Sequence, residues 1–178
     1  MISIFSVRWR NFIAVILLLS AFACSPHWNW RMVRSEDAPV SILLPAKPTS
    51  HAGDIDLNGN KVKMYMTATE VNGLSFAIGS ISIDDPAKHA DALLAMQTAM
   101  IRNIKGEVRT QKPVKLEGNV AANEIVVSGR IGNANMPVLM AARFASKGTW
   151  VVQAVVVGPE KNLSGEVIDT FLGSLILL

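Results

Sequence analysis

The stretch NEIVVSGRIGNANMPVLMAARFASKGTWVVQAVVV, residues 123–157, decides the fold class of this chain. It contains three apolar runs without a helical period, and the connecting GNAN and SKG sequences favour tight turns. Runs joined by turns this short predict consecutive antiparallel strands. The third run, TWVVQAVVV, is apolar on both faces, so we expect it at the centre of a sheet.

The alternation of side chains in this stretch also predicts a register. Matching the core positions sets Ile131 opposite Met136 and sets Glu124 opposite Arg143 on the outer face of the sheet. For the second turn we expect three residues, 146–148, with Gly148 in the left-handed position. The predicted core face consists of Ile125, Val127, Gly129, Ile131, Val138, Met140, Ala142, Phe144, Trp150 and Val152.

Further strands are expected on the N-terminal side of this stretch. They lie in VSILLP (40–45), NKVKMYMTATEV (60–71), LSFAIGSISI (74–83) and VRTQKPVKL (108–116). Asn72-Gly73, between the second and the third of them, predicts a hairpin turn. The PAKPTS segment, 45–50, reads as a loop.

Two helices complete the expected fold. Asp85 caps the first, Pro86 takes its first position, and Gly106 ends it; Ser164 caps the second. The apolar stripe expected on the first helix is Ala90, Leu93, Leu94, Met100, Ile101 and Ile104, and that on the second is Val167, Ile168, Phe171, Leu172 and Leu175. The sequence therefore predicts an α+β fold, an antiparallel sheet of about six to seven strands with helices packed on it.

The N-terminal segment has the features of a bacterial export signal. Arg8 and Arg10 precede an uncharged apolar run, 12–23, which is short for a membrane-spanning helix. Small residues close the run, and Cys24, the single cysteine of the chain, follows Ala23. This arrangement resembles a lipoprotein signal, although Ala21 stands where that family most often has leucine. The resemblance implies cleavage between Ala23 and Cys24 and a diacylglyceryl group on Cys24.

Two other fates of this segment stay open: an uncleaved membrane anchor, and ordinary secretion by the A-x-A rule. With lipidation, Ser25 after the cysteine favours, by resemblance to Gram-negative lipoproteins, an outer-membrane protein that faces the periplasm. The expected organisation is a signal peptide or anchor helix over 1–23, a tether over 24–38, and a folded domain over 39–178. The tether is expected because SPHWNWRMVRSEDA, 25–38, shows neither helical nor strand periodicity.

The charge of the chain does not indicate nucleic-acid binding. The formal net charge is +3, but without Arg8 and Arg10 the remaining 15 basic residues nearly balance 14 acidic ones. No run of Lys and Arg alternates with aromatic residues.

The order of elements also resembles a known group. The opening VSILLPAKP, a middle helix, several strands, VVVGPE and a closing FLGSLIL are similar to the PsbP-like family, which includes DcrB-type envelope lipoproteins. The resemblance covers about residues 40–178. It implies a three-layer α-β-α sandwich used for binding: in photosystem assembly, in Ran-GTPase binding, or in chaperoning of secretion effectors. No catalytic signature comes with it.

Metal-binding and catalytic sites have weak support in the sequence. DIDLNGN, 54–60, opens like a calcium loop, but Tyr65 stands where a bidentate glutamate is needed, so we expect a turn. His27, His51 and His89 lack metal-ligand spacing, and no G-x-S-x-G motif is present. Asp84 and Asp85 are expected at a helix N-terminus as caps.

Methionines offer one further possibility. Met64 and Met66 share a strand face, and Met96 and Met100 lie four apart on the first helix, so thioethers could hold Cu(I). Filling of the core is the simpler interpretation. We therefore expect a membrane-anchored envelope lipoprotein without enzymatic activity, metal or cofactor, which binds an envelope protein or assists assembly. The alternative is a periplasmic small-ligand or copper carrier, or an enzyme whose site forms only in three dimensions.

Overall fold

The computed structural model describes residues 28–57 and 59–178. The predicted signal or anchor helix over 1–23 lies outside them. The strands are β1 (Arg31–Arg34), β2 (Val40–Leu44), β3 (Thr49–Leu57), β4 (Asn60–Val71), β5 (Leu74–Ser82), β6 (Glu107–Lys115), β7 (Ala121–Ile131), β8 (Met136–Lys147), β9 (Trp150–Gly158) and β10 (Ile176–Leu177). The α-helices are α2 (His89–Asn103) and α3 (Gly165–Gly173). No described helix combines the length and the apolar character needed to cross a bilayer.

Seven of the strands form one antiparallel sheet, in the order β3-β4-β5-β9-β8-β7-β6. β9 lies at its centre, as its apolar sequence predicts. A second sheet, β1-β2-β10, was not expected. The α+β class and the number of strands in the main sheet are confirmed.

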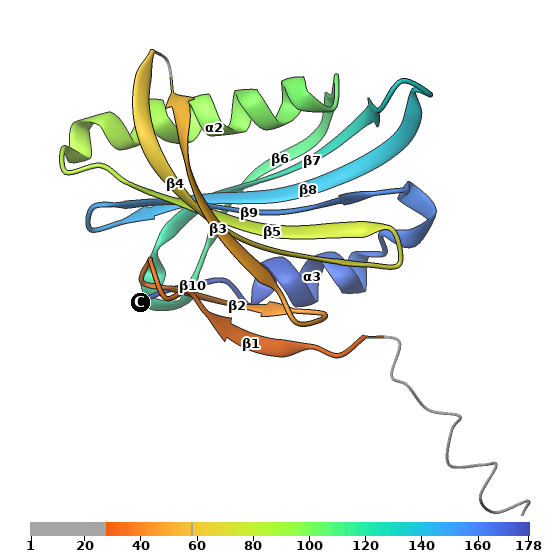
Figure 1. The fold of residues 1–178 in the computed structure, drawn as a ribbon, viewed down its shortest axis with the longest axis horizontal. Coiled ribbons are helices and arrows are strands. Elements are labelled where there is room, and N and C mark those ends of the chain that lie inside the picture. The colour runs from red at the N-terminus through yellow and green to blue at the C-terminus, as the bar shows by residue number, and fades with distance from the viewer. Residues whose placement is uncertain (1–27, 58) are drawn as a thin grey trace, which may run out of the picture.

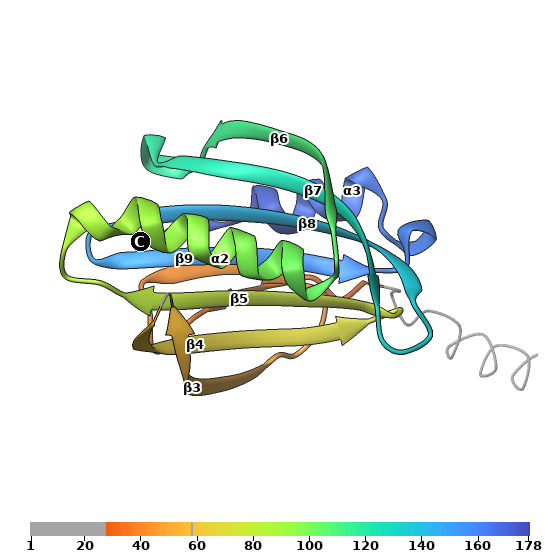
Figure 2. The ribbon, with the colours of Figure 1, turned by 90° about the horizontal axis from the view of Figure 1, so that it is seen from above.

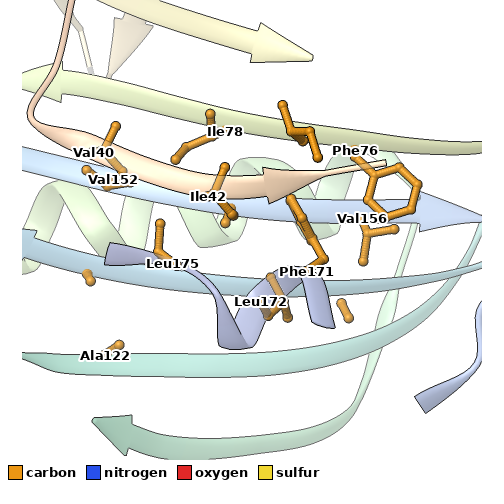
Figure 3. Packing of buried hydrophobic residues seen from close by; sticks show 14 of the residues in the cluster. Val40, Ile42, Phe76, Ile78, Ala122, Val152, Val156, Phe171, Leu172 and Leu175 are labelled. Atoms are coloured by element: carbon orange, nitrogen blue, oxygen red, sulfur yellow. The ribbon is translucent and has the colours of Figure 1, made fainter. Parts of the chain in front are cut away.

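The elements form three layers (Figures 1 and 2). α2 covers one face of the seven-stranded sheet, and α3 lies on the other face together with the small sheet. Each face of the sheet therefore has its own hydrophobic core. The core on the α3 side, in which Phe76 and Phe171 meet edge to face at 5.2 Å, is drawn in Figure 3. The core on the α2 side contains Met96, Ile125 and Met140.

The turn between β4 and β5 follows its sequence signal. Asn72 and Gly73 both have positive φ (55° and 72°), so the β4–β5 connection is a two-residue turn that closes on the Val71–Leu74 pair. In the β7–β8 hairpin Ile131 pairs with Met136, which confirms the predicted register. Gly129 is needed there because a Cβ atom would collide with the Ile104 carbonyl at the end of α2.

The predicted register of the β8–β9 hairpin is wrong. Lys147 pairs with Trp150, so the turn has two residues, Gly148 and Thr149, instead of three. Consequently Val152 pairs with Ala145, and Trp150 and Val152 lie on the α3 side, opposite to Phe144. The alternation could not reveal this, because β8 and β9 are apolar on both faces and both faces are buried.

The expected tether over 24–38 is also corrected from residue 28 onward. β1 pairs with β2 along its whole length, and Trp28 and Trp30 pack against the core on the α3 side. The indole ring of Trp30 lies edge to face on Phe76 at 5.9 Å. The described N-terminal residues are therefore part of the folded domain.

Two further differences concern β3 and α2. Residues 49–57, expected as loop and turn, form an edge strand whose exposed pattern carries little hydrophobic alternation. On α2 the buried positions are His89, Ala92 and Met96, while Leu94, predicted to face inward, is 62% exposed. A rotation of the helix relative to the expected stripe thus leaves a leucine on the outside.

Candidate functional site: the outer face of α2

The lipidation and cleavage residues predicted from the sequence, Ala23 and Cys24, lie outside the described residues, as does His27. The other candidate positions lie within the described part of the chain and can be placed.

The calcium-like segment forms the end of β3 and the following turn. Asp56 Oδ1 accepts a hydrogen bond from the Gly59 amide at 2.8 Å, and Asp54 faces Lys63 across the hairpin. Within residues 28–57 and 59–178, no three His, Cys, Asp or Glu side chains come close enough to form a metal site. The geometry supports the turn that the sequence predicts.

The described histidines and methionines that the sequence offered as metal ligands can be placed in the fold. His51 lies on the edge strand β3, not in a loop, and His89 Nε2 lies 2.9 Å from the Ile83 carbonyl, to which it donates a hydrogen bond. Met64 and Met96 are buried in the core on the α2 side, and Met66 is 41% exposed on β4. Met64 and Met96 are therefore core-filling side chains, whereas Met66 lies at the surface.

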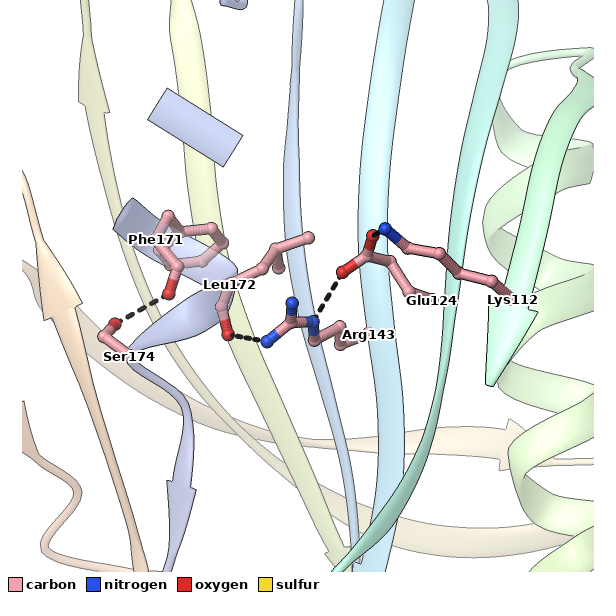
Figure 4. A network of polar contacts seen from close by, with 6 residues as sticks. All are labelled: Lys112, Glu124, Arg143, Phe171, Leu172 and Ser174. Atoms are coloured by element: carbon pink, nitrogen blue, oxygen red, sulfur yellow. Dashed lines mark hydrogen bonds and ion pairs between the residues drawn. The ribbon is translucent and has the colours of Figure 1, made fainter. Parts of the chain in front are cut away.

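A buried ion pair lies on the other side of the sheet (Figure 4). Glu124, 5% exposed, accepts from Arg143 Nε at 2.6 Å and pairs with Lys112 at 3.0 Å. Arg143 Nη1 donates to the Leu172 carbonyl at the end of α3. Burial alone would raise the pKa of Glu124, but the hydrogen bonds from Lys112 and Arg143 outweigh it, so the pKa is lowered. The carboxylate is charged and fully engaged, so this network supports the fold.

A second ion pair is exposed. Arg109, at the irregularity in the β6–β7 pairing, donates two hydrogen bonds to Glu160, at 2.6 and 3.0 Å. The hydrogen bond to Arg109 lowers the pKa of Glu160. The pair links the edge of the sheet to the turn before α3 and is likewise structural.

The outer face of α2 differs from these places because its apolar groups face solvent. Leu94 is 62% exposed, and Ala90 and Thr98, four residues to either side of it, are exposed as well. An amphipathic surface helix usually carries charged side chains on this face, but α2 has only Asp91 and Arg102. We define the α2 face by these residues: Ala90, Asp91, Leu94, Ala95, Thr98, Ala99 and Arg102.

Clefts follow the α2 face on both sides. Toward the β3–β4 hairpin lie two hollows of about 430 and 420 Å³, of which the second is lined by Asp56 and Leu57 together with most of the α2 face. Toward β6 and β7 lies a hollow of about 390 Å³ between Leu93, Leu94 and Phe144. Figure 2 shows α2 lying along the sheet with strands visible on either side of it. An exposed leucine between two grooves is an arrangement that suits a protein partner.

Another hollow, of about 560 Å³, lies at the start of α3. Lys161, Asn162 and Ser164 contribute to its wall, and Ser164 caps the helix by accepting from the Val167 amide at 3.3 Å. Asn162 Nδ2 donates to the Asn72 carbonyl at 2.8 Å and so ties the β4–β5 turn to this wall. The side chains of Asn162 and Ser164 are thus engaged in the fold, and among the described residues the hollow exposes no large apolar side chain comparable to Leu94.

Sequence reasoning missed the α2 face, because Leu94 fits the apolar stripe as well as Leu93 does. The low charge of the helix was the available signal. Two charged side chains in HADALLAMQTAMIRN are too few for a helix with one fully solvated side.

Comparisons with known proteins define the fold. No protein-family model and no curated protein sequence matches the chain. The chain is similar to the solution structure of cyanobacterial PsbP (CyanoP) from Synechocystis sp. PCC 6803, with a TM-score of 0.58 and 9% identity over 84% of this chain and 92% of that one. This likeness confirms a PsbP-like fold.

Two other solved structures are similar at a lower level. The Ran-binding protein Mog1p of Saccharomyces cerevisiae has a TM-score of 0.48 and 10% identity over 84% of this chain and 96% of its own. The Pseudomonas aeruginosa protein PA94, described as a putative regulator of unknown function, has a TM-score of 0.44 and 12% identity over 75% and 85% of the two chains.

Proposed function

We propose that the chain is a non-catalytic lipoprotein of the bacterial cell envelope, anchored through Cys24 in the outer membrane, that binds a protein in the periplasm. The lipoprotein-like signal that ends at Ala23 and Cys24 supports the anchor. The PsbP-like fold is compatible with a binding role, and the DcrB-type lipoproteins remain the group we favour.

The observation that carries the binding role is the α2 face. An exposed Leu94 with open grooves on both sides is the kind of surface that a partner covers. Its position agrees with the proposed anchor. β1, close to the first described residue, lies in the layer of α3, and α2 lies on the opposite side of the sheet (Figure 1). A domain anchored at its N-terminus can therefore hold the α2 face away from the membrane.

Site-specific photocrosslinking in intact cells tests this proposal. A photoreactive residue at Leu94 should give a discrete adduct with a protein, which mass spectrometry of the excised band identifies. The matched control carries the same residue at Glu70, an exposed position on β4 that lies outside the α2 face. Equal crosslinking from both positions, or none from Leu94, would contradict binding through α2.

A further inference from the structure

The charges of the α2 face suit one kind of partner. Asp91 and Arg102 are eleven residues apart in the helix. At 100° per residue this separation is three full turns plus about 20°, so the two side chains lie on the same face of α2. They are about 16 Å apart along the helix axis. Both line the same cleft. Neither forms an ion pair within the described ranges, where the ion pairs are Lys88–Asp85, Arg109–Glu160, Lys112–Glu124 and Arg143–Glu124.

We infer that the α2 face docks on the α2 face of a second copy of this chain, with the two helices antiparallel. The inference rests on the proposed function, since it names the partner of the same surface. A negative and a positive charge at the two ends of one stripe are self-complementary under a two-fold axis. Asp91 of each copy then lies opposite Arg102 of the other, and two ion pairs form.

The side chains between these charges fit the same register. When position 91 faces position 102, Ala95 lies level with Thr98 of the second copy. Leu94 lies about 60° round the helix from Asp91, and Ala99 lies about 80° round in the other direction, so Leu94 is on the same flank of the contact as Leu94 of the second copy. The small side chains of Ala95 and Thr98 let the two helices approach closely, and the two exposed leucines bring apolar surface together at one edge of the contact. The antiparallel direction also aligns the two helix dipoles favourably.

The geometry of the domain sets limits on this pair. α2 lies between the β3–β4 hairpin and the β6–β7 edge (Figure 2), so the contact centres on one helix of about 22 Å. An interface of this size is at the low end for specific complexes, and we expect reversible association in the micromolar range or weaker. Because β1, close to the first described residue, lies in the layer opposite α2, this layer is on the outer side of each copy in the pair.

Charge exchange tests the inference. The full chain, purified in a mild detergent, should show concentration-dependent dimers in sedimentation velocity. Asp91→Lys and Arg102→Glu should each raise the dissociation constant more than about tenfold, because like charges then face each other. An equimolar mixture of the two variants should dimerise again. In the mixed pair the two substituted positions carry opposite charges and face each other, and the unchanged Arg102 of one chain meets the unchanged Asp91 of the other.

The mixture separates pairing from a local effect on the helix. Each charge also suits its own end of α2, so both variants can lose stability, but lost helix stability in one chain is not restored by adding the other. Glu70→Lys and Lys115→Glu are the matched controls and should dimerise like the original chain, and circular dichroism checks that all variants are folded.

The outcomes also distinguish this inference from the proposed function. A chain that stays monomeric, single variants that dimerise normally, or a mixture that stays monomeric each overturn the pairing. If one of these occurs while Leu94 crosslinks to a different protein in cells, the binding role stands and the second copy is excluded as the partner. A Leu94 adduct of twice the mass of the chain, containing two differently tagged copies, supports both.

Discussion

Arg143 and Glu124 are direct neighbours across β7 and β8, and Arg143 Nε lies 2.6 Å from Glu124 Oε2. The sequence predicts this pairing but places it on an outer face. The structure covers that face with α3, whose Leu172 carbonyl accepts the second hydrogen bond of Arg143. Two strands and one helix are therefore joined through a single guanidinium.

Glu124→Gln should destabilise the protein by about 2 to 3 kcal/mol, because the partly buried guanidinium of Arg143 loses its counter-charge. Urea unfolding measures the loss. Lys112→Met should cost less than about 1 kcal/mol, since the Lys112 side chain is 62% exposed. Glu117→Gln, at an exposed position, is the control. A loss below about 0.5 kcal/mol for Glu124→Gln would show that the pair contributes little.

The same carboxylate makes stability depend on pH. The pKa of Glu124 is lower in the folded protein than in the unfolded chain, so its contribution is fully present above the unfolded pKa of about 4.3. It is lost as the pH falls through the lower, folded pKa. The difference in unfolding free energy between the original protein and Glu124→Gln should be constant near neutral pH and shrink below about pH 4. A difference that grows with acidity would contradict the lowered pKa.

Gln153→Met should stabilise the protein by about 1 kcal/mol. Gln153 lies in the central strand, 7% exposed, and its Oε1 is buried without a hydrogen-bond partner within the described residues. Methionine has a similar shape and removes the uncompensated oxygen. The control is Gln97→Met on α2, whose Oε1 accepts from Asn123 at 2.9 Å, so that this change should not stabilise. Thermal unfolding of both variants compares them directly.

Trp30→Ala should destabilise the domain by about 2 to 3 kcal/mol, because the ring packs on Phe76 and on the core of the α3 side. A tether residue would have no such effect. Met32→Ala is the matched control on the same segment, since Met32 is 56% exposed. Equal stability of the two variants in urea would restore the tether interpretation.

What the sequence could predict depends on where one face of an element is polar. β4 and β7 alternate clearly, and Asn72-Gly73 determines a turn, so these elements and the β7–β8 register follow from residue type. β8 and β9 are buried on both sides, so alternation cannot select between a two-residue and a three-residue turn after Lys147. The α2 face was missed for a similar reason, because a helix with apolar residues almost all round has no unique inner side.

The segments that the sequence assigned to loop and tether illustrate a second limit. β1 and β3 carry few of the apolar residues that signal a strand, and backbone pairing with β2 and β4 determines them instead. This pairing stabilises β1 and β3 through neighbouring strands, so the pattern of residues within either segment does not predict it.

The last prediction concerns Cys24. If it carries lipid, Cys24→Ala should release the protein from membranes or leave an uncleaved precursor, while the domain stays folded. Each buried acyl CH₂ contributes about 0.8 kcal/mol, and stable anchoring takes more than one acyl chain. The two chains of a diacylglyceryl group therefore hold the protein on the membrane, whereas contacts of the protein surface with the membrane are too weak to do so. Arg31 and Arg34 at β1 could add contacts with headgroups, which a wash at high salt removes.

Fractionation of cells after such a wash therefore separates the possible anchors. Ser25→Ala, next to the proposed lipid site, is the matched control and should stay with the membranes. Normal processing of Cys24→Ala together with sedimentation in high salt would exclude lipid as the anchor. An uncleaved membrane anchor predicts a different mature protein, one that retains Arg8 and Arg10. Mass spectrometry of the N-terminal peptide decides this point, because a lipidated protein begins at Cys24 with the added mass of its acyl chains.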